Sequence, residues 1–202
     1  MHDSGSNINA TIIQTSLIWE DSERNRENLS DKILRIEQPT DLIILPEMFT
    51  TGFSMKPEEL SEATDGKTLA WMQEHAYKTD ACITGSLMIH ENHNYYNRLF
   101  VVAPDGSYQI YDKRHLFRMG EENNNYTAAK NDYDLLIYVA NWPEIRRQIW
   151  RTLLIARAIE NQSYVIGVNR IGEDGRGLTY AGDSMVIHPK GHILSTTEPY
   201  QD

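Results

Sequence analysis

The sequence predicts a layered α/β fold with mixed β-sheets in one domain. Three observations support this: short β-rich runs alternate with amphipathic helices, two runs are apolar throughout, and the order strand, helix, strand occurs twice, each time ending in a hairpin. Consecutive apolar residues are typical of strands covered on both faces. Alternating strands and helices are typical of layered α/β proteins. No low-complexity segment or linker divides residues 1–202.

The first round contains the strongest helix and strand signals. The helix predicted over 20–36 carries Leu29, Ile33 and Ile36 at helical spacing. The apolar run 41–46 predicts a buried strand. The other elements of this round are a strand over 9–15, a helix over 69–77, a strand over 81–89, and strands over 97–103 and 108–113 joined by the turn residues Pro104-Asp105-Gly106.

The second round repeats this order and begins abruptly. A polar stretch over 128–133 runs directly into the apolar strand 135–140, so a helix and a strand are unaccounted for at this point. The following elements are a helix over 145–161, a strand over 163–170, and strands over 184–188 and 192–196 joined by Pro189-Lys190-Gly191.

Composition narrows the class of protein. The net charge is −10 with Lys and Arg scattered along the chain, which argues against a nucleic-acid partner. No apolar run approaches the roughly 20 residues of a membrane span, and the first residues show no signal-peptide pattern. One cysteine, Cys82, permits no intrachain disulfide and favours the cytoplasm. No metal-binding or phosphate-loop motif occurs, so we expect no metal and no cofactor.

Two charged residues stand where α/β proteins place their sites. Glu47 follows a buried strand, and burial there is expected to raise the pKa of its carboxyl group, which suits a general base. Lys113 ends another strand and offers a cation to a developing oxyanion. His115 follows it as a possible ligand or donor. Position alone leaves open that Glu47 and Lys113 are simply solvated and that His115 has neither role.

Other reactive residue types carry weaker signals. Glu121 and Glu122 lie in a polar stretch, where most carboxylates are solvated. Cys82 lies among apolar neighbours within a predicted strand, so we expect it to behave as a small hydrophobic residue rather than as a nucleophile.

Five segments in order resemble the nitrilase superfamily of carbon-nitrogen hydrolases, and the resemblance covers nearly the whole chain. The wording of the first segment is similar to the ω-amidase branch, whose members act on 2-oxoglutaramate. The segments are Leu45-Pro46-Glu47-Met48-Phe49-Thr50-Thr51-Gly52-Phe53-Ser54-Met55, Tyr111-Asp112-Lys113-Arg114-His115-Leu116-Phe117, Tyr138-Val139-Ala140-Asn141-Trp142-Pro143, Ala156-Arg157-Ala158-Ile159-Glu160-Asn161-Gln162, and Gly182-Asp183-Ser184 with Pro189-Lys190-Gly191.

The resemblance implies a fold and an activity. The fold is a four-layer α-β-β-α sandwich of two mixed sheets, and residues 1–202 form one carbon-nitrogen hydrolase domain. The activity is hydrolysis of a small amide, 2-oxoglutaramate or 2-oxosuccinamate, to the 2-oxo acid and ammonia. A nitrilase or a carbamoylase on the same scaffold is the alternative enzyme. The resemblance also implies a homodimer that pairs through helices after the nucleophile.

The resemblance further implies roles for single residues. Glu47 is the general base and Lys113 stabilises the tetrahedral intermediate that a cysteine forms with the amide carbon. Glu122, or else Glu121, takes the place of a second, auxiliary glutamate. The implied substrate-binding residues are Phe53, His115 and Trp142.

One family segment is absent from this sequence. The family carries its nucleophile in a segment reading Cys-Tyr-Asp-Leu-Arg-Phe-Pro, which would stand between Lys113 and Tyr138, and its C-terminal tail is absent too. A strand, the nucleophile turn and the start of a helix need roughly thirty residues, which we place near the junction 131–132. Either the complete protein carries this segment, or the chain lacks it and is at most a binding module.

Two geometric expectations follow. Although 66 residues separate them, the side-chain tips of Glu47 and Lys113 should lie within about 5 Å if both serve one reacting carbon. One arginine of the helix 145–161, among Arg146, Arg147 and Arg151, could reach a substrate carboxylate while others cross the dimer interface. The alternative for these arginines is a solvated basic face.

Overall fold

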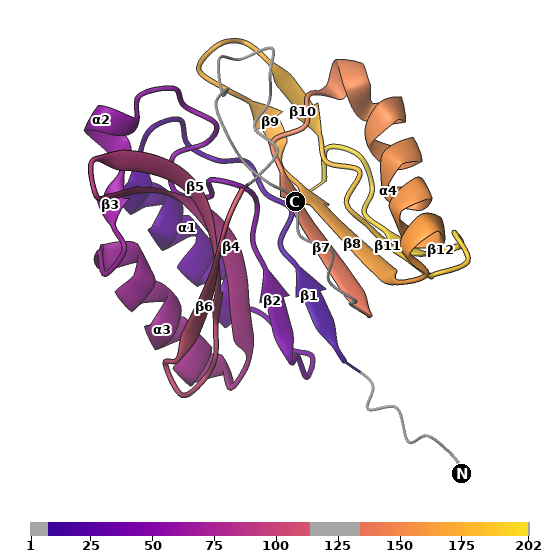
Figure 1. The fold of residues 1–202 in the computed structure, drawn as a ribbon, viewed down its shortest axis with the longest axis horizontal. Helices are drawn as coiled ribbons and strands as arrows, with labels where there is room; N and C mark the ends of the chain where they lie inside the picture. Colours follow the sequence, from indigo (N-terminus) through magenta and orange to yellow (C-terminus); the bar gives the residue numbers. More distant parts are fainter. Residues whose placement is uncertain (1–7, 114–133, 202) are drawn as a thin grey trace.

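A computed structural model describes residues 8–113 and 134–201 as two stacked β-sheets with helices on both outer faces (Figure 1). One apolar cluster joins the first sheet to its helices, and a second joins the other sheet to its helix. A third cluster, centred on Ile44, Ile166 and Val168, lies between the sheets. The predicted four-layer α-β-β-α sandwich is therefore confirmed.

The first sheet is mixed, with the strand order β1-β2-β4-β5-β6 and the short β3 beside β4. Strands β1, β2, β3 and β4 pair in parallel, whereas β4, β5 and β6 pair antiparallel. The elements are β1 (Ala10–Ile12), α1 (Ser22–Leu34), β2 (Leu42–Ile44), α2 (Pro57–Leu60), β3 (Glu62–Ala63), α3 (Lys67–Thr79), β4 (Cys82–Glu91), β5 (Asn94–Val102) and β6 (Tyr108–Asp112).

The second sheet is also mixed, with the order β12-β11-β8-β7 and one parallel pair, β7 with β8. A small hairpin of β9 and β10 stands beside it. The elements are β7 (Leu135–Ala140), the 3-10 turn η2 (Glu144–Arg146), α4 (Arg147–Asn161), β8 (Tyr164–Asn169), β9 (Ile171–Glu173), β10 (Thr179–Ala181), β11 (Met185–Ile187) and β12 (Ile193–Thr196).

The structure corrects several predicted bounds. Strand β5 begins at Asn94 rather than at residue 97, because Asn92 and His93 adopt positive φ angles of 49° and 65° and close a tight hairpin after β4. The short elements α2, β3, β9 and β10 were not predicted. The expected break at 131–132 lies outside the described residues. Within the described part of the chain, no helix is long and apolar enough to cross a membrane.

Candidate active site

Glu47 stands just past the carboxyl end of β2, between the two sheets. Leu45 N–H donates to Thr84 O at 2.8 Å, which keeps the chain paired with β4 beyond the end of β2. Met48 then turns with φ 46°, and its N–H donates to Ser86 Oγ at 3.0 Å. The turn leaves Glu47 only 5% exposed. A carboxylate buried to this degree needs hydrogen-bond partners, and it has them.

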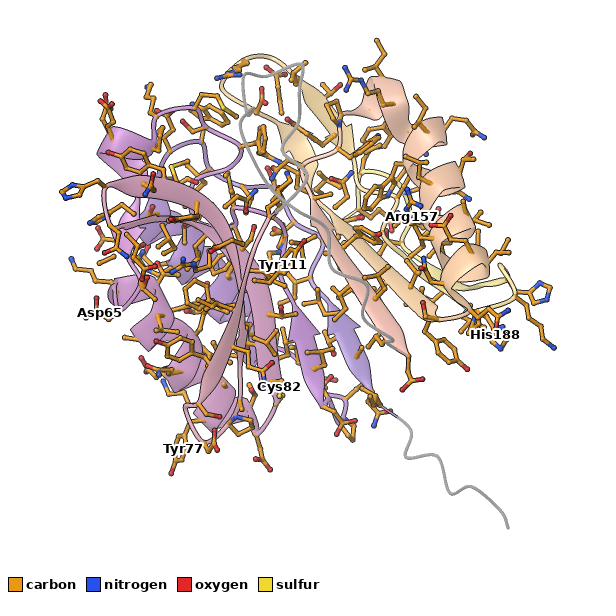
Figure 2. The ribbon with its side chains drawn as sticks, viewed as in Figure 1. Asp65, Tyr77, Cys82, Tyr111, Arg157 and His188 are labelled. Carbon is orange, nitrogen blue, oxygen red and sulfur yellow. The ribbon has the colours of Figure 1, made fainter. Side chains whose placement is uncertain are left out.

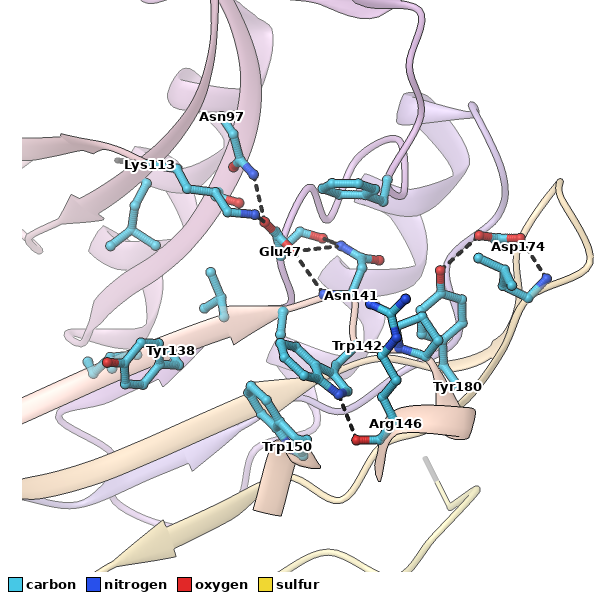
Figure 3. A pocket seen from close by; sticks show the side chains of 18 of the residues that line it. Glu47, Asn97, Lys113, Tyr138, Asn141, Trp142, Arg146, Trp150, Asp174 and Tyr180 are labelled. Atoms are coloured by element: carbon cyan, nitrogen blue, oxygen red, sulfur yellow. Dashed lines mark hydrogen bonds and ion pairs between the residues drawn. The ribbon is translucent and has the colours of Figure 1, made fainter. Parts of the chain in front are cut away.

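The carboxylate of Glu47 accepts hydrogen bonds from three other segments (Figure 3). Oε1 accepts from Asn97 Nδ2 and from Lys113 Nζ, each at 2.6 Å. Oε2 accepts from the backbone N–H of Asn141 at 2.8 Å, and Asn141 Nδ2 also donates to Glu47 O at 2.7 Å. The contact between Glu47 and Lys113 lies well within the predicted 5 Å. A single carboxylate therefore joins strands of both sheets.

The pKa of Glu47 shifts in the direction opposite to the one the sequence predicts. Burial alone would raise it, but the charge of Lys113 and the hydrogen bonds from Lys113, Asn141 and Asn97 outweigh burial and lower it. Glu47 is consequently ionised at neutral pH. Each carboxylate oxygen has about two acceptor positions. Oε1 is filled by two donors at 2.6 Å, whereas Oε2 has one close donor and a longer contact of 3.4 Å from Asn141 Nδ2, so Oε2 is the better place for an incoming proton.

Lys113 is held at both its backbone and its side chain. Its N–H donates to Asn97 O at 2.9 Å, which continues the pairing of β6 with β5. Its side chain is 30% exposed, and its ammonium group lies 5.2 Å from the ring centroid of Phe53. A cation over an aromatic face is stabilised electrostatically. Phe53 therefore helps to fix the cation beside Glu47.

Asn141 and Trp142 follow β7 in a fixed conformation. The buried Asn169, at the end of β8, accepts from Trp142 N–H at 2.8 Å through Oδ1. Its Nδ2 donates to Trp142 O at 3.0 Å and to Gly182 O at 2.9 Å. The backbone N–H of Asn141 is thus aimed at Glu47 before any ligand binds.

Glu47, Asn97, Lys113, Asn141 and Trp142 line a cavity of about 970 Å³. Among the described residues, the charged side chains of its lining are Lys113, Arg146 and Arg176 against Glu47 and Asp174, an excess of one positive charge in a chain whose net charge is −10. The apolar part of the wall is mainly β7. The lining also includes Phe53, Met55, Ser86, Asn97, Leu99, Tyr111, Asn141, Trp142, Trp150, Leu178 and Tyr180. In the described part of the chain, no group of three or more His, Cys, Asp or Glu side chains could hold a metal ion.

The structure brings some predicted site residues together and separates others. Glu47, Lys113, Phe53 and Trp142 all line the cavity. His115, Glu121 and Glu122 lie outside the described residues. Among the three arginines considered from the sequence, Arg146 lines the cavity, while Arg147 and Arg151 form ion pairs with Asp183.

Sequence reasoning missed six polar residues of the cavity wall. Among them a signal existed only for Asn141, which directly follows a buried strand as Glu47 does. No local pattern marks the other five. These residues are Ser86, Asn97, Asn141, Asp174, Arg176 and Tyr180.

Cys82 is far from this cavity and lies in a strand, as the sequence predicts for a cysteine that is not the nucleophile. It begins β4 and pairs in register with Leu42, five residues before Glu47. Five residues of strand span roughly 16 Å. Figure 2 shows Cys82 near the same end of the first sheet as Tyr77. Because the chain has one cysteine, no thiol is available at the carboxylate of Glu47.

Comparison with known proteins identifies relatives along nearly the whole chain. The carbon-nitrogen hydrolase family matches residues 9–129 and 118–201, two stretches that overlap at 118–129. Omega-amidase YafV from Escherichia coli (strain K12) is 40% identical over 96% of this chain and 86% of its own. A 2-oxoglutaramate amidase from Bacillus subtilis is 28% identical over 84% of this chain and 79% of its own.

A solved structure shows the same architecture. The crystal structure of a CN-hydrolase superfamily protein from Xanthomonas campestris, with an arsenic adduct in its active site, aligns with a TM-score of 0.90 at 36% identity. The match covers 97% of this chain and 88% of that one.

The alignments also locate a gap. The match to the Escherichia coli relative spans 223 positions but includes only 96% of the 202 residues, about 194, so about 29 of its positions have no residue of this chain. The two stretches that match the family meet at 118–129, near the junction that the sequence marks as abrupt.

Proposed function

The chain belongs to the carbon-nitrogen hydrolase family as an amidase, as the sequence predicted, and from this premise we propose that it is an ω-amidase. The proposed reaction converts 2-oxoglutaramate or 2-oxosuccinamate to the 2-oxo acid and ammonia. The name omega-amidase, carried by relatives at about 40% identity, and the name 2-oxoglutaramate amidase, carried by a relative at 28% identity, support this substrate class. The observation that carries it is the positive excess in the cavity, since a 2-oxo acid amide brings a carboxylate into an otherwise acidic protein.

We assign roles from the geometry around Glu47. Glu47 Oε2 takes the proton of a cysteine thiol, and the thiolate attacks the amide carbon. Lys113 stabilises the resulting oxyanion. The C–N bond then breaks, the proton returns from Glu47 to the leaving ammonia, and a thioester remains. Water attacks the thioester with Glu47 as base, which releases the acid and the thiol.

The nucleophile belongs, in this proposal, to a segment between Lys113 and Tyr138. The gap of about 29 alignment positions is long enough for a strand, a turn and the start of a helix. The 202 residues without it form one carbon-nitrogen hydrolase domain with a base and a cation but no thiol at the site. We propose the cytoplasm as the compartment, because its reducing conditions would maintain such a thiol.

A second candidate is a binding module for carboxylated amides. The position of Cys82, far from Glu47, favours a binding module for the 202-residue chain. Such a module would bind the amide in the same cavity and release it unchanged.

A graft separates the two candidates. The segment of the Escherichia coli relative that has no counterpart here is inserted between Asn131 and Asp132, and ammonia release from 2-oxoglutaramate is measured. We expect turnover by the graft, none by the 202-residue chain, and none by a graft with its cysteine changed to serine. A folded graft that binds 2-oxoglutaramate without hydrolysing it would favour the binding module.

We also propose a homodimer through α4. The outer face of this helix and of the turn before it exposes Ile145, Ile149 and Leu153, which are 89%, 52% and 41% exposed. Apolar side chains at spacings of four residues form one stripe along a helix. Two copies related by a twofold axis would cover this stripe.

A further inference from the structure

We infer that Arg146 and Arg176 hold the carboxylate of the substrate on the cavity wall formed by η2 and the β9–β10 hairpin. This inference rests on the proposed function and deepens it, because it names the residues that distinguish a carboxylated amide from a neutral one. Arg176 was not a candidate from the sequence.

Two nearby arginines are already engaged elsewhere. Arg147 donates to Asp183 through Nε at 2.9 Å and Nη2 at 2.8 Å, a bidentate pair. Arg151 Nη1 lies 3.4 Å from the same carboxylate, whose side chain is 1% exposed. Neither arginine lines the cavity, whereas Arg146 and Arg176 both do. The ion pairs with Asp183 hold Arg147 and Arg151 along α4, so the arginines that a ligand in the cavity can contact are Arg146 and Arg176.

Arg176 is carried by a turn that Asp174 holds rigid. Asp174 Oδ1 accepts from the N–H groups of Arg176 and Leu178, each at 2.9 Å. Its Oδ2 accepts from the hydroxyl of Tyr180 at 2.8 Å. Burial and this hydrogen bond raise the pKa of Tyr180, so the phenol remains a donor. The carboxylate of Asp174 is thus occupied by hydrogen bonds within its own hairpin, and Arg176 extends from a turn that these bonds hold in place.

Arg146 reaches the same wall from η2. Its carbonyl accepts from Trp142 Nε1 at 2.8 Å, which fixes the turn from within. Glu144 ties η2 to β10, because its carboxylate accepts a hydrogen bond from the side chain of Thr179. Figure 3 shows Arg146 beside Tyr180, the residue that supports the turn of Arg176. Both arginines therefore belong to one side of the cavity.

The charges around this wall favour an anion. Glu47 is paired with Lys113 at 2.6 Å, and Asp174 accepts three hydrogen bonds of its own hairpin. The charge of Arg176 also acts on Glu20, a carboxylate already held by Lys56 at 2.8 Å and by the hydroxyl of Ser54 at 2.6 Å. Among the ion pairs between described residues, none includes Arg176. A guanidinium group binds carboxylates with planar, paired hydrogen bonds.

The test is a binding experiment on the 202-residue chain, which requires no turnover. Isothermal titration compares glutaramate, a carboxylated amide, with pentanamide, which is neutral. We expect Arg146→Gln and Arg176→Gln each to raise the Kd for glutaramate about tenfold and to leave the Kd for pentanamide unchanged. The control is Arg157→Gln, which removes the same charge from the exposed face of α4, where Arg157 pairs with Glu160, and should shift neither Kd by more than about twofold.

Tyr180→Phe tests the support of the turn. It should raise the Kd for glutaramate about threefold in the otherwise unchanged chain and have no further effect in Arg176→Gln, since the two residues act through one turn. Thermal unfolding of each variant confirms that it is folded. Additive effects of the two substitutions would overturn the role of Tyr180.

The outcomes separate this inference from the proposed function. An unchanged Kd for glutaramate in Arg176→Gln and Arg146→Gln, equal losses for pentanamide, or no glutaramate binding by the unchanged chain would overturn the inference. Arginine-dependent binding together with an inactive graft would support the inference and reject the proposed amidase. An active graft whose turnover of 2-oxoglutaramate is unchanged by both arginine substitutions would support the proposed amidase and reject the inference.

Discussion

Replacing Glu47 with Gln removes the proposed base and keeps its volume, so its effects on activity and on stability can be predicted separately. Every group that faces the carboxylate is a donor: Asn97 Nδ2, Lys113 Nζ and the N–H of Asn141. A glutamine side chain must point its own NH₂ group at one of them. The variant also removes the ion pair between Lys113 and Glu47. We expect the grafted enzyme to lose turnover with this substitution and the chain to remain folded.

The free energy of unfolding should fall by about 2 kcal/mol at pH 7. Breaking a buried ion pair costs roughly 3–5 kcal/mol. The side chain of Lys113 is 30% exposed and can turn its ammonium group toward water, so the cost here falls at or below the lower end of that range. For a chain of this length, 2 kcal/mol corresponds to a decrease in Tm of about 4–8 °C. Urea denaturation followed by circular dichroism measures the change. The control is Glu58→Gln, because Glu58 is exposed on α2.

The pH dependence of this difference in free energy of unfolding provides the stricter test. The pKa of Glu47 is lowered in the folded protein, so its contribution is fully present above the pKa of the unfolded chain, about 4.3, and is lost as pH falls through the folded pKa. The stability gap between the unchanged chain and Glu47→Gln should therefore narrow below about pH 4.3. A gap that stays constant or widens in acid, or no loss of stability at pH 7, would refute the reasoning.

Three further substitutions have expected outcomes. Burial lowers the pKa of His75, so stability should decline as pH falls below about 6.5, and urea denaturation across pH should show a flatter decline in His75→Gln. Gly167→Ala would bring a Cβ within 2.3 Å of Leu154 Cδ1, and calorimetry should show a loss of about 1–3 kcal/mol from overpacking between β8 and α4. Ile149→Glu should convert the proposed dimer to a monomer in light scattering, because Ile149 is 52% exposed on one copy and a charge there would have to be buried between two copies.

The long elements could be predicted from the sequence because their patterns repeat. The strand Leu135–Ala140 has its predicted bounds, and α4 ends at Asn161 as predicted. β3 and β10 contain two and three residues, too few to show a period. Their pairing depends on contacts with distant strands, which no local pattern encodes.

The site could be predicted only where a local feature of the sequence marks its residues. Glu47 and Lys113 are marked by their places at strand ends, whereas Asn97 comes from the middle of β5 and is 50 residues from the carboxylate that it contacts. The predicted rise in the pKa of Glu47 was wrong because it counted burial alone. The donors that reverse the shift, from Asn97, Lys113 and Asn141, converge only when both sheets are formed.

The intact mass of the protein purified from its source tests the central claim most directly. The claim is that an amidase site built on Glu47 and Lys113 receives its cysteine from a segment between Lys113 and Tyr138. A mass above 23.3 kDa by about 3 kDa, the size of roughly 29 residues, is the predicted result. A mass of 23.3 kDa would contradict the claim, since no thiol would then reach the carboxylate.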